Sequence, residues 1–127
     1  MLDLDALSNH DTSIGFLENL LSMRSWEREN VPLYQPQIAL DILLHSSACA
    51  AKGQPAKIKD IHLAIGHSQD RIREIIRELV NGDWLIPERD KHDGRARRVL
   101  PSPKCLSLLE NYRSRLLDYM SRAHSSQ

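Results

Sequence analysis

The sequence of 127 residues contains two cysteines and no long run of apolar residues. Cys49 and Cys105 lie far apart and lack the paired spacing of metal ligands, so we expect buried, reduced thiols. A redox-sensing role for either thiol is the alternative, and it requires an exposed, electropositive setting. No apolar stretch approaches the roughly 18 residues of a membrane span, and the acidic N-terminus lacks the basic flank of a signal peptide. We therefore expect a cytoplasmic protein without a membrane partner.

Sequence motifs of catalysis are also missing. There is no glycine-rich phosphate loop, no nucleophile elbow and no set of metal ligands. His45 and Cys49 are ligand types four residues apart, but no third ligand follows at a suitable spacing, so we expect a packed histidine and thiol. Asp60 and His62, two residues apart on an expected helix, do not face each other and form no dyad. The sequence predicts neither catalysis nor a metal or cofactor.

Net charge is absent as well, because 17 basic residues balance 17 acidic residues. The charges are unevenly distributed along the chain. Residues 1–30 hold six acids and two bases, whereas residues 89–98 hold five bases and two acids. The local field, rather than the average charge, determines whether a surface attracts phosphate. Nucleic acid therefore remains a candidate partner despite the neutral total.

What the sequence does contain is a series of helical periodicities, and its length predicts one domain over residues 1–127. We expect helices over 1–30 with a break near 8–13, over 36–51, 58–65 and 68–82, and from 103 toward the C-terminus. Two strands, 84–86 and 95–100, are expected around a polar turn at 87–94. The predicted fold class is mainly α with a small β-wing.

The segment Ser68–Gly82 has the pattern of a recognition helix. Ser68 can cap its first turn through its hydroxyl group. Its apolar residues follow one helical face: Ile72, Ile75, Ile76, Leu79 and Val80. Gly66 and His67 leave only a tight turn after the preceding helix, which predicts a helix-turn-helix. With the two strands as its wing, this pattern predicts a winged helix-turn-helix core over residues 35–101.

The helices expected at the two ends of the chain, within residues 1–34 and 102–127, carry more apolar side chains than one contact face uses. The first contains Ile14, Phe16, Leu17, Leu20, Leu21, Met23 and Trp26. The last contains Leu106, Leu108, Leu109, Tyr112, Leu116, Leu117, Tyr119, Met120 and Ala123. We expect these dimerisation helices to bury the surplus against a second copy of the chain.

Residues 57–105 resemble the winged-helix core of the MarR family of bacterial transcription regulators. The ungapped match runs through Ile61-His62, Gly66, Ser68–Leu79, Asp83-Trp84-Leu85, Asp90–Arg95 and Pro101–Cys105. Its most specific part is Asp93-Gly94-Arg95, which matches the family's Asp-x-Arg in the wing. The resemblance implies a homodimer that binds double-stranded DNA sequence-specifically and regulates transcription. Its two recognition helices would read half-sites about one helical turn apart.

The resemblance also implies roles for individual residues. Bases would be approached by Gln69, Asp70 and Arg73. Phosphates would be approached by Ser68, Arg77, Lys57 and Lys59. The minor groove would receive Arg95, oriented by Asp93. The expected DNA-binding set is completed by Arg71, Lys91 and Arg97.

Two questions stay open at this point. Many relatives bind a small phenolic or similar acid as effector, and Trp26, Tyr34 and His45 could line such a pocket here or simply belong to the core. The winged helix could also be a protein-binding or assembly module without DNA readout. The acidic residues Asp70, Glu74 and Glu78 favour this second function, because they dilute the positive charge of the recognition helix.

Overall fold

The computed structural model describes the backbone of residues 11–31 and 35–125, and the side chains of residues 14–31 and 35–121. The elements follow in the order α2 (Asp11–Asn30), α3 (Pro36–Ala51), β1 (Ala56–Lys57), α4 (Ile58–Ile65), α5 (Gln69–Asn81), β2 (Leu85–Arg89), β3 (Ala96–Pro101) and α6 (Pro103–Ser125). The predicted helix over residues 1–10, with the start of its break, lies outside the described residues.

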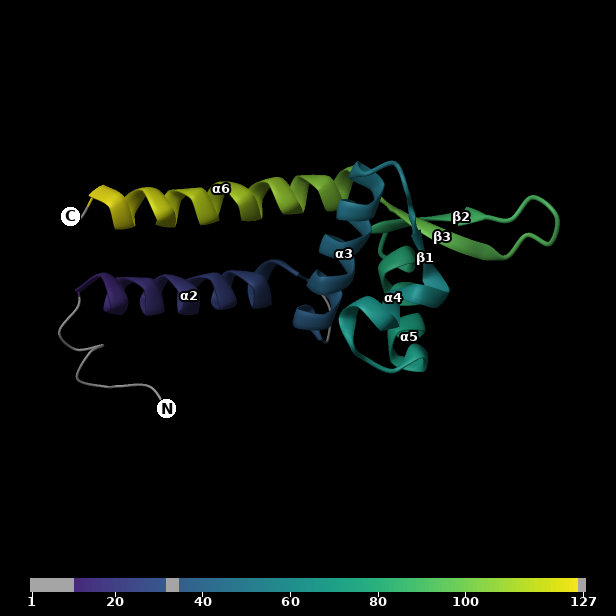
Figure 1. The fold of residues 1–127 in the computed structure, drawn as a ribbon, viewed down its shortest axis with the longest axis horizontal. Coiled ribbons are helices and arrows are strands. Elements are labelled where there is room, and N and C mark those ends of the chain that lie inside the picture. Colours follow the sequence, from purple (N-terminus) through teal and green to yellow (C-terminus); the bar gives the residue numbers. More distant parts are fainter. Residues whose placement is uncertain (1–10, 32–34, 126–127) are drawn as a thin grey trace.

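The described elements form a head with two extensions. Figure 1 shows α3, α4, α5 and the strands gathered in the head, while α2 and α6 lie side by side and extend from it. The hairpin of β2 and β3 extends in the opposite direction (Figure 1). The predicted fold class, mainly α with a small β-wing, is confirmed. No helix of the described ranges has both the length and the apolar character needed to cross a membrane.

The sheet differs from the prediction in two places. β2 extends to Arg89, so the expected turn at 87–94 was wrong for its first three residues. Pro87 is tolerated there because β2 is an edge strand of the antiparallel order β1-β3-β2, and an edge can leave a missing N–H on its open side. β1 was not predicted at all, because two residues are too few for an alternating pattern. It pairs Lys57 with Arg98 of β3.

The hydrophobic core lies where α3 and α5 pack against the sheet. Its fully or nearly fully buried members include Leu40, Ile42, Leu43, Ile61, Ile72, Ile75, Ile76, Leu79, Leu85 and Val99. The stripe predicted on the recognition helix is therefore confirmed at four of its five positions, and Val80 is partly buried. Burying this stripe turns the opposite, polar face of α5 outward.

The two cysteines occupy different environments. Cys105 is fully buried and lies 3.8 Å from the hydroxyl oxygen of Ser47, as expected for a packed thiol. Burial raises the pKa of the Cys105 thiol above its ordinary value. Cys49 is only partly buried, so the expectation of a buried thiol was wrong at this position. Its side chain lies at the margin of the core, where α3 borders solvent.

α2 is fastened to α6 near the head by a buried carboxylate. Glu27 is 2% exposed and accepts hydrogen bonds from Arg24 at 3.0 Å and from the hydroxyl of Tyr112 at 3.1 Å. Burial raises the pKa of Tyr112, and the hydrogen bond to Glu27 raises it further. The rings of Trp26 and Tyr112 also meet edge to face, with their centroids 5.6 Å apart. These contacts set the position of α2 beside α6.

Away from this joint, on either side of it, α2 and α6 carry large apolar side chains that remain exposed in the single chain. They are Ile14, Phe16, Leu17, Leu20 and Leu21 on α2 and Leu106, Leu116, Leu117 and Met120 on α6. Exposed apolar surface of this extent is unusual on a monomer and is typical of interaction sites. The surplus expected at both ends of the chain is therefore present among the described side chains.

Candidate nucleic-acid interface

The turn between α4 and α5 is built as the sequence predicts. Gly66 ends α4 in the left-handed conformation, with φ of +89°, and its N–H donates to the carbonyl of His62 at 2.9 Å. The hydroxyl of Ser68 accepts from the N–H of Arg71 at 3.2 Å and caps α5. A non-glycine residue would be strained in this left-handed conformation. The tight turn between the two helices therefore depends on glycine at position 66.

A cleft of about 800 Å³ lies between α5 and the β2–β3 hairpin. We name it the basic cleft, because its charged lining residues are Lys57, Lys59, Arg73, Arg77, Arg89, Asp90, Arg95, Arg97 and Arg98. Eight of these nine side chains are basic and one is acidic. Arg73 comes from the recognition helix and Arg95 from the wing, so both elements direct positive charge to one surface. Such a concentration of cations attracts a polyanion.

Two of these cations face each other across the sheet. Lys57 of β1 and Arg98 of β3 are register partners in an antiparallel pair, which places their side chains on the same face. Directly opposed like charges destabilise a sheet unless something compensates them. Glu88 pairs with Arg98 on its other side, and Arg98 donates to the carbonyl of Pro55 at 3.3 Å. An anion in the basic cleft would complete the compensation.

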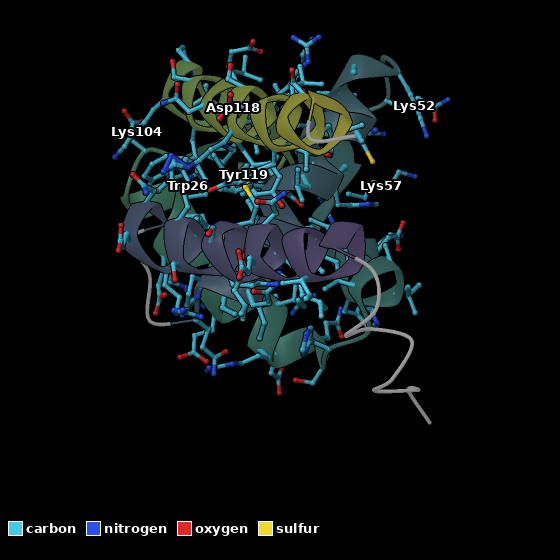
Figure 2. The ribbon with its side chains drawn as sticks, turned by 90° about the vertical axis from the view of Figure 1, so that its left-hand side faces the viewer. Trp26, Lys52, Lys57, Lys104, Asp118 and Tyr119 are labelled. Atoms are coloured by element: carbon cyan, nitrogen blue, oxygen red, sulfur yellow. The ribbon has the colours of Figure 1, made fainter. Side chains whose placement is uncertain are left out.

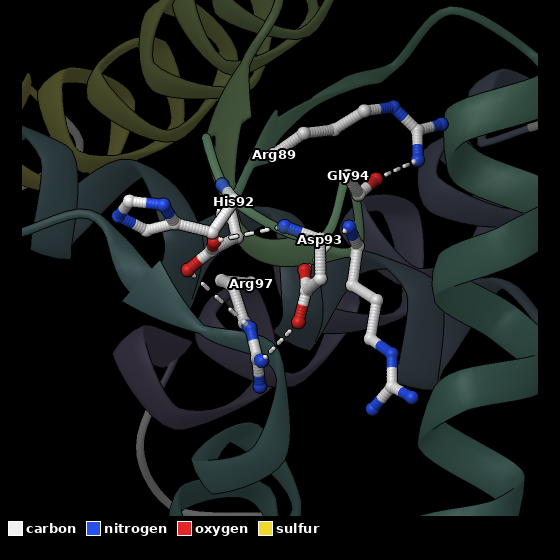
Figure 3. Close-up of polar contacts among 7 residues, drawn as sticks. Arg89, His92, Asp93, Gly94 and Arg97 are labelled. Atoms are coloured by element: carbon white, nitrogen blue, oxygen red, sulfur yellow. Dashed lines mark hydrogen bonds and ion pairs between the residues drawn. The ribbon is translucent and has the colours of Figure 1, made fainter.

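The wing comprises β2, β3 and the turn at residues 90–95, and Asp90 organises that turn. The carboxylate of Asp90 accepts from the N–H of His92 at 2.8 Å and of Asp93 at 3.3 Å. These two hydrogen bonds hold the pKa of Asp90 below its ordinary value. The guanidinium of Arg89 donates to the carbonyl of Gly94 at 3.1 Å (Figure 3). The wing therefore has a fixed tip rather than an open loop.

The role expected for Asp93 was wrong in one respect. Its carboxylate was to orient the side chain of Arg95, but it binds the guanidinium of Arg97 at 2.8 Å instead (Figure 3). The other oxygen of Asp93 accepts from the backbone N–H of Arg95 at 3.0 Å. In the described part of the chain, the guanidinium of Arg95 has no hydrogen bond or ion pair. Arg95 therefore keeps its charge available to the basic cleft.

Of the comparisons with known proteins, the one with solved structures identifies the fold. Searches with family models and among curated proteins find no match to the sequence. Among solved structures, MepR of Staphylococcus aureus, bound to ethidium bromide, is similar at a TM-score of 0.65 and 14% identity, over 94% of this chain and 85% of that one. A second, MarR of Staphylococcus aureus in complex with salicylate and kanamycin, has a TM-score of 0.59 and 20% identity, over 97% and 77%. A third, a MarR-like transcriptional regulator of Thermotoga maritima, has a TM-score of 0.57 and 16% identity, over 93% and 84%.

The chain has the MarR-type winged-helix fold. In this MarR-type fold, the predicted site residues divide into those that line the basic cleft and those that do not. The cleft contains Lys57, Lys59, Arg73, Arg77, Arg95 and Arg97 of the predicted set. Exposed positions outside it hold Ser68, Gln69, Asp70, Lys91 and Asp93. The cleft therefore joins the part of the recognition helix from Arg73 to Asn81 to the wing.

Arg71 has a different surrounding from the one expected. Its Nε donates to the side chain of Gln35 at 3.0 Å, and its Nη1 pairs with Glu74 at 3.2 Å. The side chain thereby ties α5 to the residue that precedes α3. Arg71 therefore links α5 to the start of α3, whereas Arg73 and Arg77 are the arginines of this helix that line the basic cleft.

Sequence reasoning missed Arg89 and Arg98 as lining residues of the basic cleft. Both belong to the basic run at 89–98, which was the available signal. The expected turn at 87–94 removed Arg89 from a strand, and the missing β1 removed the neighbour that places Arg98 beside Lys57. The errors in strand assignment therefore became errors in the site.

The residues expected to bind an effector do not share one pocket. Trp26 borders a pocket of about 360 Å³ on α2 and α6, together with Arg115 and Tyr119. Figure 2, viewed from the end of these two helices, shows Trp26 and Tyr119 between them. His45 borders a separate pocket beside β1. Tyr34 lies outside the described residues, and the prediction of a joint site was wrong for the other two.

Proposed function

We propose that the chain binds double-stranded DNA through the basic cleft and acts as a transcriptional regulator. The observation that carries this proposal is the meeting of Arg73 and Arg95 in one cleft with six further basic side chains. Arginine side chains can bind phosphates, guanine edges and a narrow minor groove, which are the parts of a duplex that a helix and a wing reach. The MarR-type fold supports the same function.

The acidic residues of the recognition helix support the rival proposal of a protein-binding module less than they first suggest. Glu74 pairs with Arg71, and Asp70 and Glu78 lie outside the basic cleft. The charge that a partner would meet between helix and wing is therefore positive. A partner of that surface has to be strongly anionic, which favours a duplex over an ordinary protein face.

We further propose that two copies associate through α2 and α6. Nine large apolar side chains on these helices remain exposed in the single chain. Burying one such side chain stabilises an interface by about 1.5–3 kcal/mol, so the pair of helices has enough apolar surface for a stable contact. A twofold dimer would present two basic clefts, and its site would contain two half-sites about 34 Å apart.

The deciding experiment selects bound sites from a random duplex library with the full chain. We expect enrichment of a pseudo-palindromic site whose half-sites are separated by about one helical turn. Arg73→Ala and Arg95→Ala should each weaken binding of the selected duplex in a fluorescence titration at low and moderate salt. Failure to enrich any site, or binding that both variants leave unchanged, would count against the assignment.

A small aromatic acid is the effector that we propose for the pocket beside Trp26. The rings of Trp26 and Tyr119 offer stacking surface, and Arg115 offers a cation for a carboxylate. Salicylate is the probe of choice, because the similar MarR of Staphylococcus aureus is seen with it. We expect salicylate to change the tryptophan fluorescence of the chain, and the change should disappear in Trp26→Phe. An identical change in that variant would assign the signal to Trp84 and exclude this pocket.

A further inference from the structure

A second pocket of about 530 Å³ lies between α3, β1 and the start of α4. Its lining includes the side chains of His45, Cys49, Lys57, Asp60 and Arg98. The function proposed above uses neither His45 nor Cys49. The described side chains contain no group of three or more metal-ligating residues, so His45 and Cys49 require another explanation than a metal.

Cys49 lies one helical turn after His45, and its Sγ is 3.6 Å from the imidazole Nε2. At that separation the imidazole can take the proton of the thiol. Lys57, Arg98 and Asp60 line the same pocket, so two cations and one carboxylate share it with this pair. A partly exposed thiol with a histidine partner and a surplus of cations is the setting in which cysteines react.

The contrast with Cys105 makes this setting specific. Cys105 is 0% exposed and contacts only a serine hydroxyl among the described polar groups, and burial raises its pKa. A neutral, inaccessible thiol reacts slowly with oxidants. The same chain therefore carries a reactive thiol and an internal reference for it.

The pocket is physically connected to the basic cleft. Lys57 and Arg98 line both cavities, and they are direct register partners in β1 and β3. An acceptor oxygen added to Cys49 would enter the pocket that these two cations line. The cations would then be drawn from the side that meets phosphate.

We propose that Cys49 is an oxidation site for hydroperoxides and that its oxidation weakens duplex binding. His45 takes the thiol proton, and the thiolate sulfur attacks one oxygen of the peroxide. An S–O bond forms while the O–O bond breaks, so that sulfur is oxidised by two electrons and the peroxide is reduced. The departing hydroxide of hydrogen peroxide, or the alkoxide of a substituted hydroperoxide, takes the proton from His45 and leaves as water or as an alcohol, and Cys49 becomes a sulfenic acid. Only the effect on binding rests on the proposed function, because the oxidation itself does not involve DNA.

The first experiment measures the oxidation directly. The full chain is treated with hydrogen peroxide and a sulfenic-acid trap such as dimedone, and the labelled peptides are quantified by mass spectrometry. We expect Cys49 to be labelled at least about tenfold faster than Cys105, and His45→Gln to slow the labelling of Cys49. Labelling of Cys105 should not change in that variant, which controls for a loosened fold. Equal rates at the two cysteines would overturn the site.

The second experiment measures binding of the selected duplex before and after peroxide. We expect oxidation to weaken binding by about fivefold, with recovery after dithiothreitol. Cys49→Ser should bind the duplex normally, and peroxide should not change its affinity. Cys49→Asp should bind the duplex weakly even without peroxide. Labelling at Cys49 with unchanged binding would overturn the coupling. If the untreated chain binds no duplex, the proposed function and the coupling both fail, and the labelling rates alone decide the oxidation site.

Discussion

Removal of one charge from the basic cleft is the sharpest test of the proposed DNA binding. Arg73 is an exposed residue of α5 that lines the cleft, and it has no ion pair in the described part of the chain. Arg73→Gln keeps a polar side chain that can hydrogen bond, but it removes the positive charge. The substitution should therefore change the electrostatic component of binding without disturbing the buried stripe of the helix.

The expected magnitude follows from the number of cations. Seven of the eight basic side chains in the cleft have no ion pair with a described residue, Arg97 being the exception. If each met one phosphate, log K would fall with log salt at a slope of up to about −6 per chain. Arg73→Gln should reduce the slope by about 0.9 per chain and by about twice that in a dimer. When salt rises from about 0.1 M to about 0.2 M, the variant should then lose about twofold less affinity per chain than wild type loses.

The assay is fluorescence anisotropy of the selected duplex, titrated with wild type and variant over a series of salt concentrations. Arg113→Gln is the matched control, because Arg113 is an exposed residue of α6, 69% accessible and away from the cleft lining. Thermal unfolding of each variant establishes that the fold is intact. A slope for Arg73→Gln equal to that of wild type would refute the assignment. Equal flattening by Arg113→Gln would show that net charge, rather than the cleft, governs binding.

Three further predictions concern the fold and the assembly. Tyr112→Phe should lower the free energy of unfolding by about 1–3 kcal/mol in urea titrations, because buried Glu27 loses a donor. Since folding raises the pKa of Tyr112, its contribution is complete below the unfolded pKa of about 10 and is lost as pH rises through the higher folded value. The variant should lack this alkaline decrease, and an equal decrease in both proteins would contradict the argument. Gly66→Ala should cost about 1–2 kcal/mol in thermal unfolding, because φ is +89° even though the added Cβ meets nothing within 4 Å; unchanged stability would exclude strain at this turn. Leu21→Glu, at a side chain that is 68% exposed, should convert a dimer to a monomer in sedimentation velocity with unchanged circular dichroism, and a wild type that sediments as a monomer would refute the dimer.

The recognition helix was predictable because its determinants are local. The cap at Ser68 involves the N–H of a residue three positions later, and Gly66 ends the preceding helix through its own φ. The apolar period of 3.6 residues also acts within the segment and identified the four residues that the core buries. Interactions of this range can be found by inspecting a window of a dozen residues.

The wing and the head were predictable only in part. Two-residue β1 has no periodic signal, and Pro87 is acceptable in β2 only because tertiary pairing makes that strand an edge. Arg71 was assigned to DNA from its place on the helix, yet it binds Gln35, which is 36 residues away in the sequence. A long side chain has several partners within reach, and packing alone determines which of them is near.

By itself, the sequence therefore determined the order of the helices, the helix-turn-helix and the basic character of residues 89–98, since these depend on residue type and short spacing. Tertiary structure decided that Lys57, Arg73 and Arg98 line the same cleft, and that Lys57 and Arg98 also border the pocket of Cys49. These residues are far apart in the chain, and they meet because β1 pairs with β3 while α5 packs beside β2 of the same sheet. The physical reason is that the packing of the core decides which charged side chains come together, and the spacing of residues along the chain does not encode that packing.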